Sequence, residues 1–165
     1  MRLFPIAAIA ALSVSLVACS KTENGSEAKT APAPTATAGP SDAEKAALLA
    51  TLPAPYNGGD LANGQRKFAL CRSCHTIAEG GPALTGPNLY GVFGRQAGAL
   101  ADFAYSPAVK AAGFVWDGEH LDKWLADPRG FMPGTKMSFA GLKDPKDRID
   151  LIAYLKVETG YKPAT

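Results

Sequence analysis

The pattern of apolar and polar positions divides the chain into an apolar start, a polar stretch and a long segment with helical periodicity. Residues 3–18 are nearly all apolar, whereas residues 20–40 contain no large apolar side chain. Beyond residue 55, stretches with apolar residues three and four positions apart predict helices with one buried face. The pattern therefore predicts one folded domain over residues 56–163, preceded by two segments of different character.

Three stretches of this domain are predicted to be helices, because each begins at or after an aspartate that can cap the first turn. They are residues 60–70, 118–126 and 145–158, with Asp60, Asp117 and Asp144 as the caps. The second has one apolar face, formed by Leu121, Trp124 and Leu125. The third has an apolar stripe of Ile149, Ile152 and Ala153, with Leu151, Tyr154 and Leu155 beside it, and is expected to stop at Gly160.

Two shorter helices are predicted with less support from the pattern. Residues 41–51 begin with Ser41 and carry Glu44 three positions later, which is the spacing of a capping box. Proline at position 53 ends this helix. Residues 107–112 form the other short helix, and the sequence shows no convincing strand pairing or internal repeat.

Long loops separate the predicted helices. Residues 76–104 and 127–143 are rich in glycine and proline. Loops of this length are uncommon in compact domains unless they serve a function. We therefore expect them to wrap around a buried prosthetic group, which would replace part of the missing apolar core.

The first twenty residues indicate export and a lipid anchor. Arg2 precedes the apolar run 3–18, which is too short to favour a membrane-spanning helix of about 20 residues. Cys19 follows small residues and stands where a signal peptide would be cut, an arrangement that resembles the lipobox of bacterial lipoproteins. The alternative is an ordinary signal peptide with an incidental cysteine, but an odd free thiol in an exported protein favours lipidation.

The predicted organisation has three parts. A signal peptide spans residues 1–18, a lipidated cysteine with a tether and a short helix spans residues 19–55, and the domain spans residues 56–163. The tether is rich in alanine, proline and threonine, which is typical of an extended, flexible linker. We expect an exported protein on the periplasmic side, anchored by lipid to a bacterial membrane.

Cys71, Cys74 and His75 form the C-x-x-C-H signature of covalent haem attachment. Two thiols on one helical turn match the spacing of the two vinyl groups of haem, and the next residue is then placed beneath the iron. His75 is predicted to ligate through Nε2 while Nδ1 donates to a backbone carbonyl. A thioredoxin-like pair would need a βαβ setting, and a zinc site would need a second Cys/His pair, whereas His120 is the only other histidine.

The sixth iron ligand has three candidates, which are Met132, Met137 and His120. A thioether on the iron would raise the reduction potential relative to a second histidine. Met137 follows a proline and a glycine that fix the loop backbone. The residues alone give it only a modest preference over Met132.

Residues 58–161 resemble the class I cytochromes c, which include mitochondrial cytochrome c. The resemblance rests on Gly64, Phe68, the C-x-x-C-H signature and residues 85–95, 132–142 and 150–156. It implies an all-α fold in which helices and Ω-type loops surround one covalent haem c, and it selects Met137 as the sixth ligand. It also implies that Gly64 lets Tyr154 cross close to the first helix of the domain, with Phe68 against Leu151.

The same resemblance implies further roles around the haem. Pro87 would pack on the His75 ring, with a neighbouring loop carbonyl accepting the imidazole proton. Tyr105 and Trp116 would hydrogen-bond one propionate, Arg95 would help to neutralise it, and Thr135 would reach the other propionate or a buried water. The chain departs from the family at Trp124, where a tyrosine usually contacts the methionine sulfur, and at Val109, where an asparagine often holds a buried water.

A haem iron with both axial positions filled by protein favours electron transfer over catalysis. We expect a monomeric one-electron carrier, not an enzyme, that docks with redox protein complexes and binds no nucleic acid. It would shuttle electrons from a cytochrome bc complex to a terminal oxidase while the lipid on Cys19 holds it at a membrane. The alternatives are an electron-accepting domain of a periplasmic dehydrogenase, or a peroxidase or ligand-binding haem protein if Met137 dissociates.

The net charge of the chain is only +2. A local basic patch is nevertheless predicted around the haem edge, made of Arg72, Arg129, Lys136, Lys143 and Lys146. Such a patch would steer association with an acidic partner. The alternative is a solvated surface with scattered lysines.

Overall fold

The computed structural model describes residues 39–163 of the chain. The predicted signal peptide, Cys19 and nearly all of the tether lie outside these described residues, so the structure does not bear on them.

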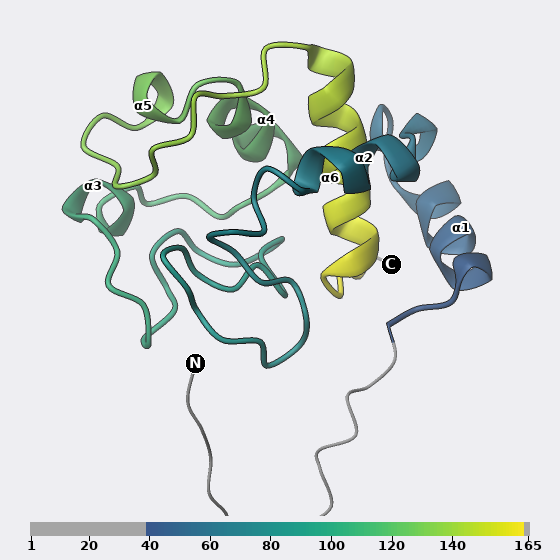
Figure 1. Cartoon of the computed structure of the whole chain (residues 1–165), viewed down its shortest axis with the longest axis horizontal. Coiled ribbons are helices and arrows are strands. Elements are labelled where there is room, and N and C mark those ends of the chain that lie inside the picture. The colour runs from purple at the N-terminus through teal and green to yellow at the C-terminus, as the bar shows by residue number, and fades with distance from the viewer. Residues whose placement is uncertain (1–38, 164–165) are drawn as a thin grey trace, which may run out of the picture. The chain divides into compact units, whose positions relative to one another are not determined.

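The described residues form six α-helices and one 3-10 turn, connected by long loops (Figure 1). In chain order they are α1 (Asp42–Thr51), η1 (Tyr56–Gly58), α2 (Leu61–Phe68), α3 (Pro107–Lys110), α4 (Gly118–Ala126), α5 (Pro128–Phe131) and α6 (Pro145–Glu158). Within residues 39–163 there is no strand, and one isolated antiparallel bridge joins Gln96 to Val115. None of the helices in this range is long and apolar enough to cross a membrane. The predicted all-α fold is confirmed.

Side-chain caps set the starts of the predicted helices. The Asp60 carboxylate accepts from the Asn63 backbone N–H at 2.9 Å, and the Asp117 carboxylate accepts from the His120 N–H at 2.7 Å. These contacts satisfy backbone donors that have no partner inside the helix. The bounds of α4 and α6 agree with the sequence prediction, whereas α2 ends two residues earlier, at Phe68, where the chain turns.

Helix α5 was not predicted. Asp127 caps it, since its carboxylate accepts from the Gly130 N–H at 3.1 Å, and Pro128 occupies the first helical position. An aspartate followed by a proline also begins α6. Residues 127–143, which are predicted to be a loop, therefore contain the same helix-start signal.

Helices α2 and α6 cross at a very short distance. A Cβ placed on Gly64 would overlap the Asp150 carbonyl oxygen and the Tyr154 Cβ, so only glycine permits this approach. The rings of Phe68 and Tyr154 lie beside the crossing, with centroids 5.8 Å apart. The predicted role of Gly64 is confirmed.

Burial of α6 extends beyond the apolar residues that the sequence predicted. Every residue from Asp150 to Val157 is buried, including the polar Asp150 and Lys156. The reason is that α6 is contacted from several sides, by α2, α4, α1 and η1. A helix enclosed in this way shows no single apolar face in its sequence.

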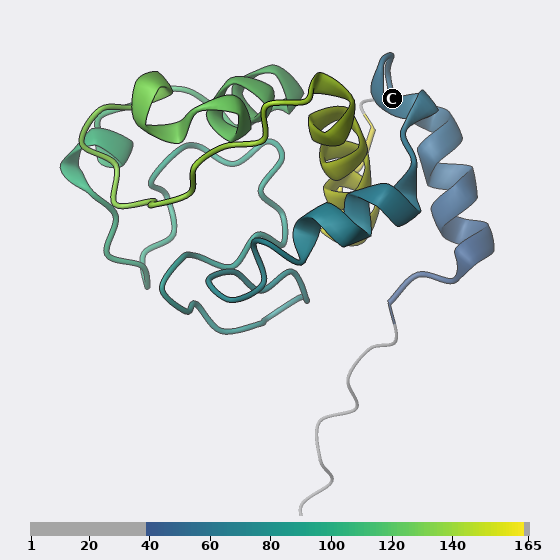
Figure 2. The same cartoon turned by 45° about the horizontal axis from the view of Figure 1, so that its top comes forward.

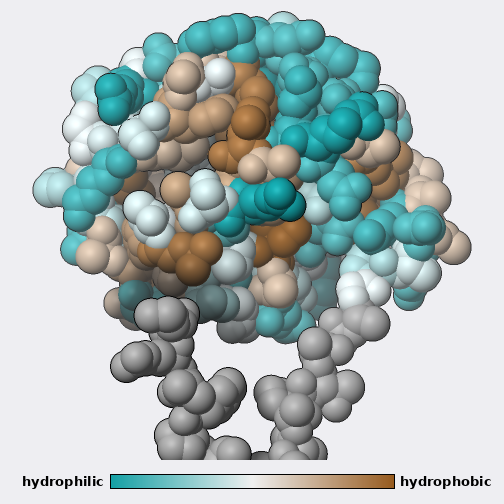
Figure 3. Space-filling model, viewed as in Figure 1, coloured by the Kyte–Doolittle hydropathy of each residue, from teal (hydrophilic) through white to brown (hydrophobic). Residues whose placement is uncertain are grey.

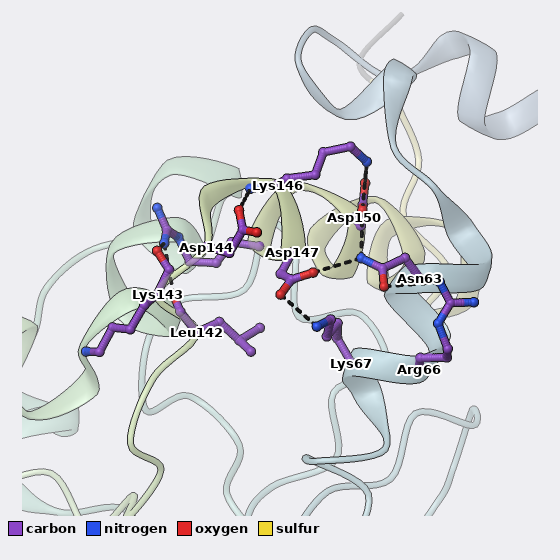
Figure 4. Close-up of polar contacts among 10 residues, drawn as sticks. Asn63, Arg66, Lys67, Leu142, Lys143, Asp144, Lys146, Asp147 and Asp150 are labelled. Atoms are coloured by element: carbon purple, nitrogen blue, oxygen red, sulfur yellow. Dashed lines mark hydrogen bonds and ion pairs between the residues drawn. The ribbon is translucent and has the colours of Figure 1, made fainter.

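Polar contacts complete the α2–α6 crossing (Figure 4). The buried Asp150 carboxylate accepts from the Asp60 N–H at 2.8 Å, from Asn63 Nδ2 at 2.9 Å and from Lys146 Nζ at 2.6 Å. Burial alone would raise the pKa of Asp150, but these donors hold it below its ordinary value. The carboxylate therefore stays charged and ties the start of α2 to α6.

Helix α1 also belongs to this folded body. It contacts η1 and α6, and Lys45 Nζ lies 2.6 Å from the Glu158 carboxylate. Leu52, which follows α1, is only 3% exposed. Figures 1 and 2 show α1 on the side of α6 that faces away from α3 and α5.

Candidate functional site

One cavity of about 570 Å³ lies among the loops and α4. Its walls come from the turn after α2, the loops before and after α3, α4 and residues 135–139. Helices α1 and α6 contribute none of its lining residues. All nine site residues predicted from the sequence line this cavity, namely Cys71, Cys74, His75, Pro87, Arg95, Tyr105, Trp116, Thr135 and Met137.

The turn after α2 places both cysteines and His75 at one wall. The Cys71 N–H donates to the Phe68 carbonyl at 2.8 Å, and the N–H groups of Cys74 and His75 both donate to the Cys71 carbonyl at 3.0 Å. This tight turn continues the chain beyond α2 and brings all three side chains to the cavity. The local geometry is the one that the C-x-x-C-H spacing predicts.

The two alternative uses of these cysteines, as a thioredoxin-like redox pair or as part of a zinc site, receive no support. Burial, with a smaller contribution from Cys74, raises the pKa of Cys71 to about 11, whereas redox-active C-x-x-C pairs have a lowered thiol pKa. Within residues 39–163 there is also no group of three or more His, Cys, Asp or Glu side chains that could hold a metal ion.

The His75 ring is held by its backbone neighbours. Nδ1 lies 2.8 Å from the Pro87 carbonyl and donates to it, which leaves Nε2 as the nitrogen available to a metal. Gly86 lies against the ring, since a Cβ there would overlap its atoms. Burial lowers the pKa of His75, partly offset by the hydrogen bond to Pro87, and this favours the neutral imidazole that binds metals.

Arg95 is fixed by the loop that supports His75. Its guanidinium donates to the Tyr90 carbonyl and to the Asn88 carbonyl, both at 3.0 Å. Burial lowers the pKa of Arg95, although the nearby Tyr105 and Asp102 raise it in part. The half-buried cation thus lines the cavity where an anionic group would be stabilised.

Met137 is the one of the three candidate sixth ligands that lines the cavity. Its backbone N–H donates to Thr135 Oγ1 at 3.2 Å, which orders the loop around it. Met132 is 7% exposed and packs in the core instead. His120 stacks on Phe114, with centroids 4.3 Å apart, and its Nδ1 lies 2.8 Å from the Asp117 carboxylate.

Aromatic and apolar side chains form the rest of the wall. Trp116 and Trp124 are both nearly buried, with ring centroids 5.5 Å apart, and Val109 lines the cavity beside them. Burial raises the pKa of Tyr105, so its hydroxyl remains a donor at neutral pH. Val109 and Trp124, at which the chain departs from the class I cytochromes c that it resembles, therefore both line the cavity.

Several residues of the cavity wall were not predicted from the sequence. They include Gly86, Phe103, Ser106 and Phe139. Gly86 could have been predicted, because it lies beside Pro87 within residues 85–95, which resemble the family. Its contact with the His75 ring, however, depends on how the loop folds. Phe103 and Phe139 could not be predicted, because the sequence around an aromatic residue does not show whether it lines a cavity or packs in an ordinary core.

The residues of this cavity fit a covalently held haem. Two thiols stand one turn apart, an imidazole has one nitrogen fixed and the other free, and a thioether lines the same space. Histidine with methionine is the axial pair of electron-transferring cytochromes.

The predicted basic patch is only partly supported, because Lys136 lines the cavity while Lys146 forms its ion pair with Asp150.

Comparisons with known proteins point in the same direction. Residues 61–157 match the family model described as Cytochrome c. The cytochrome c of Theileria parva is 54% identical over 99 residues, covering 59% of this chain and 85% of that protein. The cytochrome c of Chlamydomonas reinhardtii is 51% identical over 102 residues, covering 61% of this chain and 91% of that protein.

A solved structure is similar as well. Cytochrome cH from Methylobacterium extorquens matches with a TM-score of 0.56 and 48% identity, covering 59% of this chain and 98% of that chain. Helix α1 lies outside the residues matched by the family model.

Proposed function

The chain belongs to the cytochrome c family, and we propose that it is a one-electron carrier whose haem is held in the cavity between His75 and Met137. It carries one covalent haem c and is an electron-transfer protein rather than an enzyme. The observation that carries the assignment of the site is that all nine predicted residues line a single cavity.

Each of the principal residues has a distinct role in this proposal. The thiols of Cys71 and Cys74 would form thioether bonds to the haem. Nε2 of His75 and the sulfur of Met137 would ligate the iron. The Pro87 carbonyl orients the imidazole by accepting from Nδ1, as is usual for a metal-bound histidine.

The haem supplies an iron that alternates between the ferrous and ferric states. The protein keeps the surroundings of the iron dry and apolar through Trp116, Leu121 and Trp124, which are all less than 10% exposed. The Arg95 guanidinium, held by the Tyr90 carbonyl, would offset the negative charge of a haem propionate. His75 and Met137 together would hold the iron and would leave no position on it for a substrate, which supports electron transfer.

The assignment of Met137 is tested by a pair of methionine variants. Met137→Ala should abolish the charge-transfer absorption of a methionine-ligated ferric haem. It should also lower the reduction potential by at least about 0.1 V, within the roughly 0.8 V over which axial ligands set haem potentials. Spectroscopy and protein-film voltammetry measure both changes.

The control is Met132→Leu, which replaces a methionine of the core outside the cavity lining. It should keep both the absorption and the potential of the parent protein. Loss of the absorption in Met132→Leu, with retention in Met137→Ala, would reverse the assignment.

We also propose that lipid on Cys19 tethers the carrier to the periplasmic side of a bacterial membrane, where it passes electrons from a cytochrome bc complex to a terminal oxidase. The sequence before the domain supports this proposal. A flexible tether of 21 residues has a root-mean-square reach of about 25 Å. Confinement to such a layer raises the effective concentration at membrane complexes.

Replacing Cys19 with serine tests the anchor. The Cys19→Ser protein should move from the membrane fraction to the soluble fraction with its haem spectrum unchanged. If the variant remains with the membranes, lipid on Cys19 is not the anchor. Time-resolved haem oxidation in membranes with defined oxidases then tests the partner.

A further inference from the structure

The loops that support the His75 ring are held by hydrogen bonds rather than by an apolar layer of their own. Among residues 76–86 only Gly86 is buried. On the face of the molecule that Figure 3 shows, apolar residues likewise reach the surface in separate patches among hydrophilic ones. The position of these loops, and of the Pro87 carbonyl within them, therefore depends on individual polar contacts.

Backbone hydrogen bonds bring two segments together around that carbonyl. The Gly86 N–H donates to the Cys74 carbonyl at 2.8 Å. The Leu89 N–H donates to the Thr76 carbonyl, also at 2.8 Å. Pro87 lies between these donors in the chain and, as a proline, has no N–H of its own. The direction of its carbonyl is therefore set by its neighbours.

The side chain of Asn88 adds a second connection between the same two segments. Its Nδ2 donates to Thr76 Oγ1 at 2.7 Å. The Ala78 and Gly81 carbonyls accept from the same nitrogen at 2.9 Å and 3.0 Å. The Asn88 Oδ1 accepts from the Tyr90 N–H at 2.6 Å. This one amide therefore joins the two segments through both of its polar atoms.

Further contacts show that the surroundings accommodate this amide. The Thr76 hydroxyl donates its proton to the Pro82 carbonyl at 2.7 Å, which leaves its oxygen free to accept from Asn88. A Cβ on Gly81 would lie 2.7 Å from the Asn88 Nδ2, so glycine permits the close approach. The backbone carbonyl of Asn88 accepts from the Arg95 guanidinium at 3.0 Å. The side chain and the backbone of Asn88 are thus both held.

We propose that Asn88 is a positioning residue that keeps the Pro87 carbonyl on the imidazole of His75. The Pro87 carbonyl and the Asn88 N–H belong to one planar peptide unit, so fixing Asn88 fixes the direction of that carbonyl. A hydrogen bond from the second ring nitrogen makes a histidine a more basic metal ligand, which favours the ferric state. The proposal rests on the proposed electron-carrier function, in which His75 ligates the haem iron. Asn88 acts from outside the cavity, because it is not among the lining residues.

Asn88→Ala in the haem-loaded protein tests the proposal through two readouts that follow the imidazole rather than stability. In the ferrous protein, NMR should show the Nδ1 proton of His75 exchanging with solvent at least about threefold faster, because its hydrogen bond is weakened. At a fixed solution potential, the ratio of ferrous to ferric protein should rise at least about twofold. Loss of the hydrogen-bond partner of a metal ligand costs roughly 10- to 100-fold in metal affinity, which bounds the effect.

Asn63→Ala is the matched control. The Asn63 Nδ2 also joins two elements, since it donates to the Asp147 and Asp150 carboxylates at 2.9 Å, but it lies at the α2–α6 crossing and lines no part of the cavity. Both variants should unfold at a lower urea concentration than the parent protein. Only Asn88→Ala should change the proton exchange and the ferrous-to-ferric ratio.

Thr76→Val is the milder second variant and replaces Asn88→Ala if that protein does not fold. It exchanges the hydroxyl that accepts from Asn88 for a methyl group of similar size. The contacts of Asn88 with Ala78 and Gly81 remain in place. Both readouts should move in the same direction as in Asn88→Ala, by a smaller factor.

Two results would overturn the proposal. One is a loss of stability in Asn88→Ala, or in Thr76→Val in its place, while the exchange of the Nδ1 proton and the ferrous-to-ferric ratio stay at the parent values. The other is an equal change of both readouts in Asn63→Ala. The proposed function fails separately, if voltammetry of the haem-loaded parent protein shows no reversible one-electron wave.

Discussion

At the scale of single residues, the placement of the His75 ring depends on a glycine. Gly86 is buried, and a Cβ at this position would lie only 2.3–2.7 Å from three atoms of the imidazole ring. The ring cannot give way without losing the hydrogen bond from Nδ1 to the Pro87 carbonyl. The support of the proposed iron ligand is therefore built from backbone as much as from side chains.

Gly86→Ala should displace the imidazole and weaken its bond to the iron. We expect a fall in stability of about 1–3 kcal/mol, as for other overpacked sites, and an altered reduction potential. Chemical denaturation and voltammetry measure the two effects. Gly58→Ala is the matched control, because a Cβ there has no atom within 4 Å, and equal effects of both substitutions would contradict the argument.

Lys156 is a buried cation outside the haem site. Its Nζ lies 3.6 Å from the ring centroid of Tyr161, 4.3 Å from that of Phe93 and 5.6 Å from that of Tyr56. Burial lowers the pKa of Lys156 to about 8, with Asp117 acting in the opposite direction. The three rings attract the cation and offset part of the cost of removing it from water.

The lowered pKa gives a definite pH dependence. Between about pH 8 and 10 the unfolded chain, in which lysine has its ordinary pKa, binds more protons than the folded protein. The free energy of unfolding should therefore gain a contribution that increases with pH, by at most about 3 kcal/mol. Urea unfolding of the parent and of Lys156→Met, measured across this pH range, isolates the contribution of Lys156. If the difference in the free energy of unfolding between the two proteins does not vary with pH, this contribution is ruled out.

The sequence predicted which candidate site residues lie together where a motif fixes their spacing. Cys71, Cys74 and His75 lie on one turn, so neighbours in the chain are neighbours at the site. Periodicity could not show which of Met132 and Met137 is the better candidate ligand, because both lie in one loop. Only the folded structure places Met132 in the core and Met137 at the cavity. The resemblance to a known family made that choice.

At the scale of elements, α2 and α6 cross at a distance that only a glycine at position 64 permits. Gly64→Ala should cost about 1–3 kcal/mol or more, because its Cβ would meet backbone of α6, which cannot move aside as a flexible side chain would. Gln65→Ala, at an exposed position on the same helix, should stay within about 0.5 kcal/mol of the parent. Urea denaturation followed by circular dichroism gives both values, and equal stabilities would contradict the close approach.

Caps predicted the helices better than apolar patterns did. Asp60, Asp117 and Asp144 mark the starts of α2, α4 and α6, because a cap acts within a few residues of the chain. The apolar pattern of α6 did not show that Asp150 and Lys156 are buried as well, because the helix is enclosed by partners distant in sequence. It also could not show whether residues 41–51 contact the domain, since that depends on the position of Glu158 in the folded protein.

At the scale of the whole molecule, the haem takes the place of a core. Without it, the largely apolar walls of a cavity of about 570 Å³ would face water, and the loops would lose the group against which they pack. The loops around the cavity cannot keep their arrangement on their own.

The Cys71→Ala/Cys74→Ala protein, produced without haem, should therefore lose cooperative unfolding and fixed aromatic packing. We expect a flat calorimetric trace and a weak near-ultraviolet circular dichroism signal, with part of the helical signal retained. Trp116 and Trp124, which line the cavity, should report the change through fluorescence that is more exposed to solvent. A sharp calorimetric transition like that of the haem-loaded protein would show that the loops hold without the haem.

The contact of α1 with α6 also sets where the chain enters the domain. Residue 39 leads into α1, which contacts η1 and α6 and forms the ion pair of Lys45 with Glu158. No residue of α1 or α6 lines the cavity. The N-terminal segment therefore joins the domain at elements that take no part in the cavity wall, so α1 can vary in sequence without altering the surroundings of His75 and Met137.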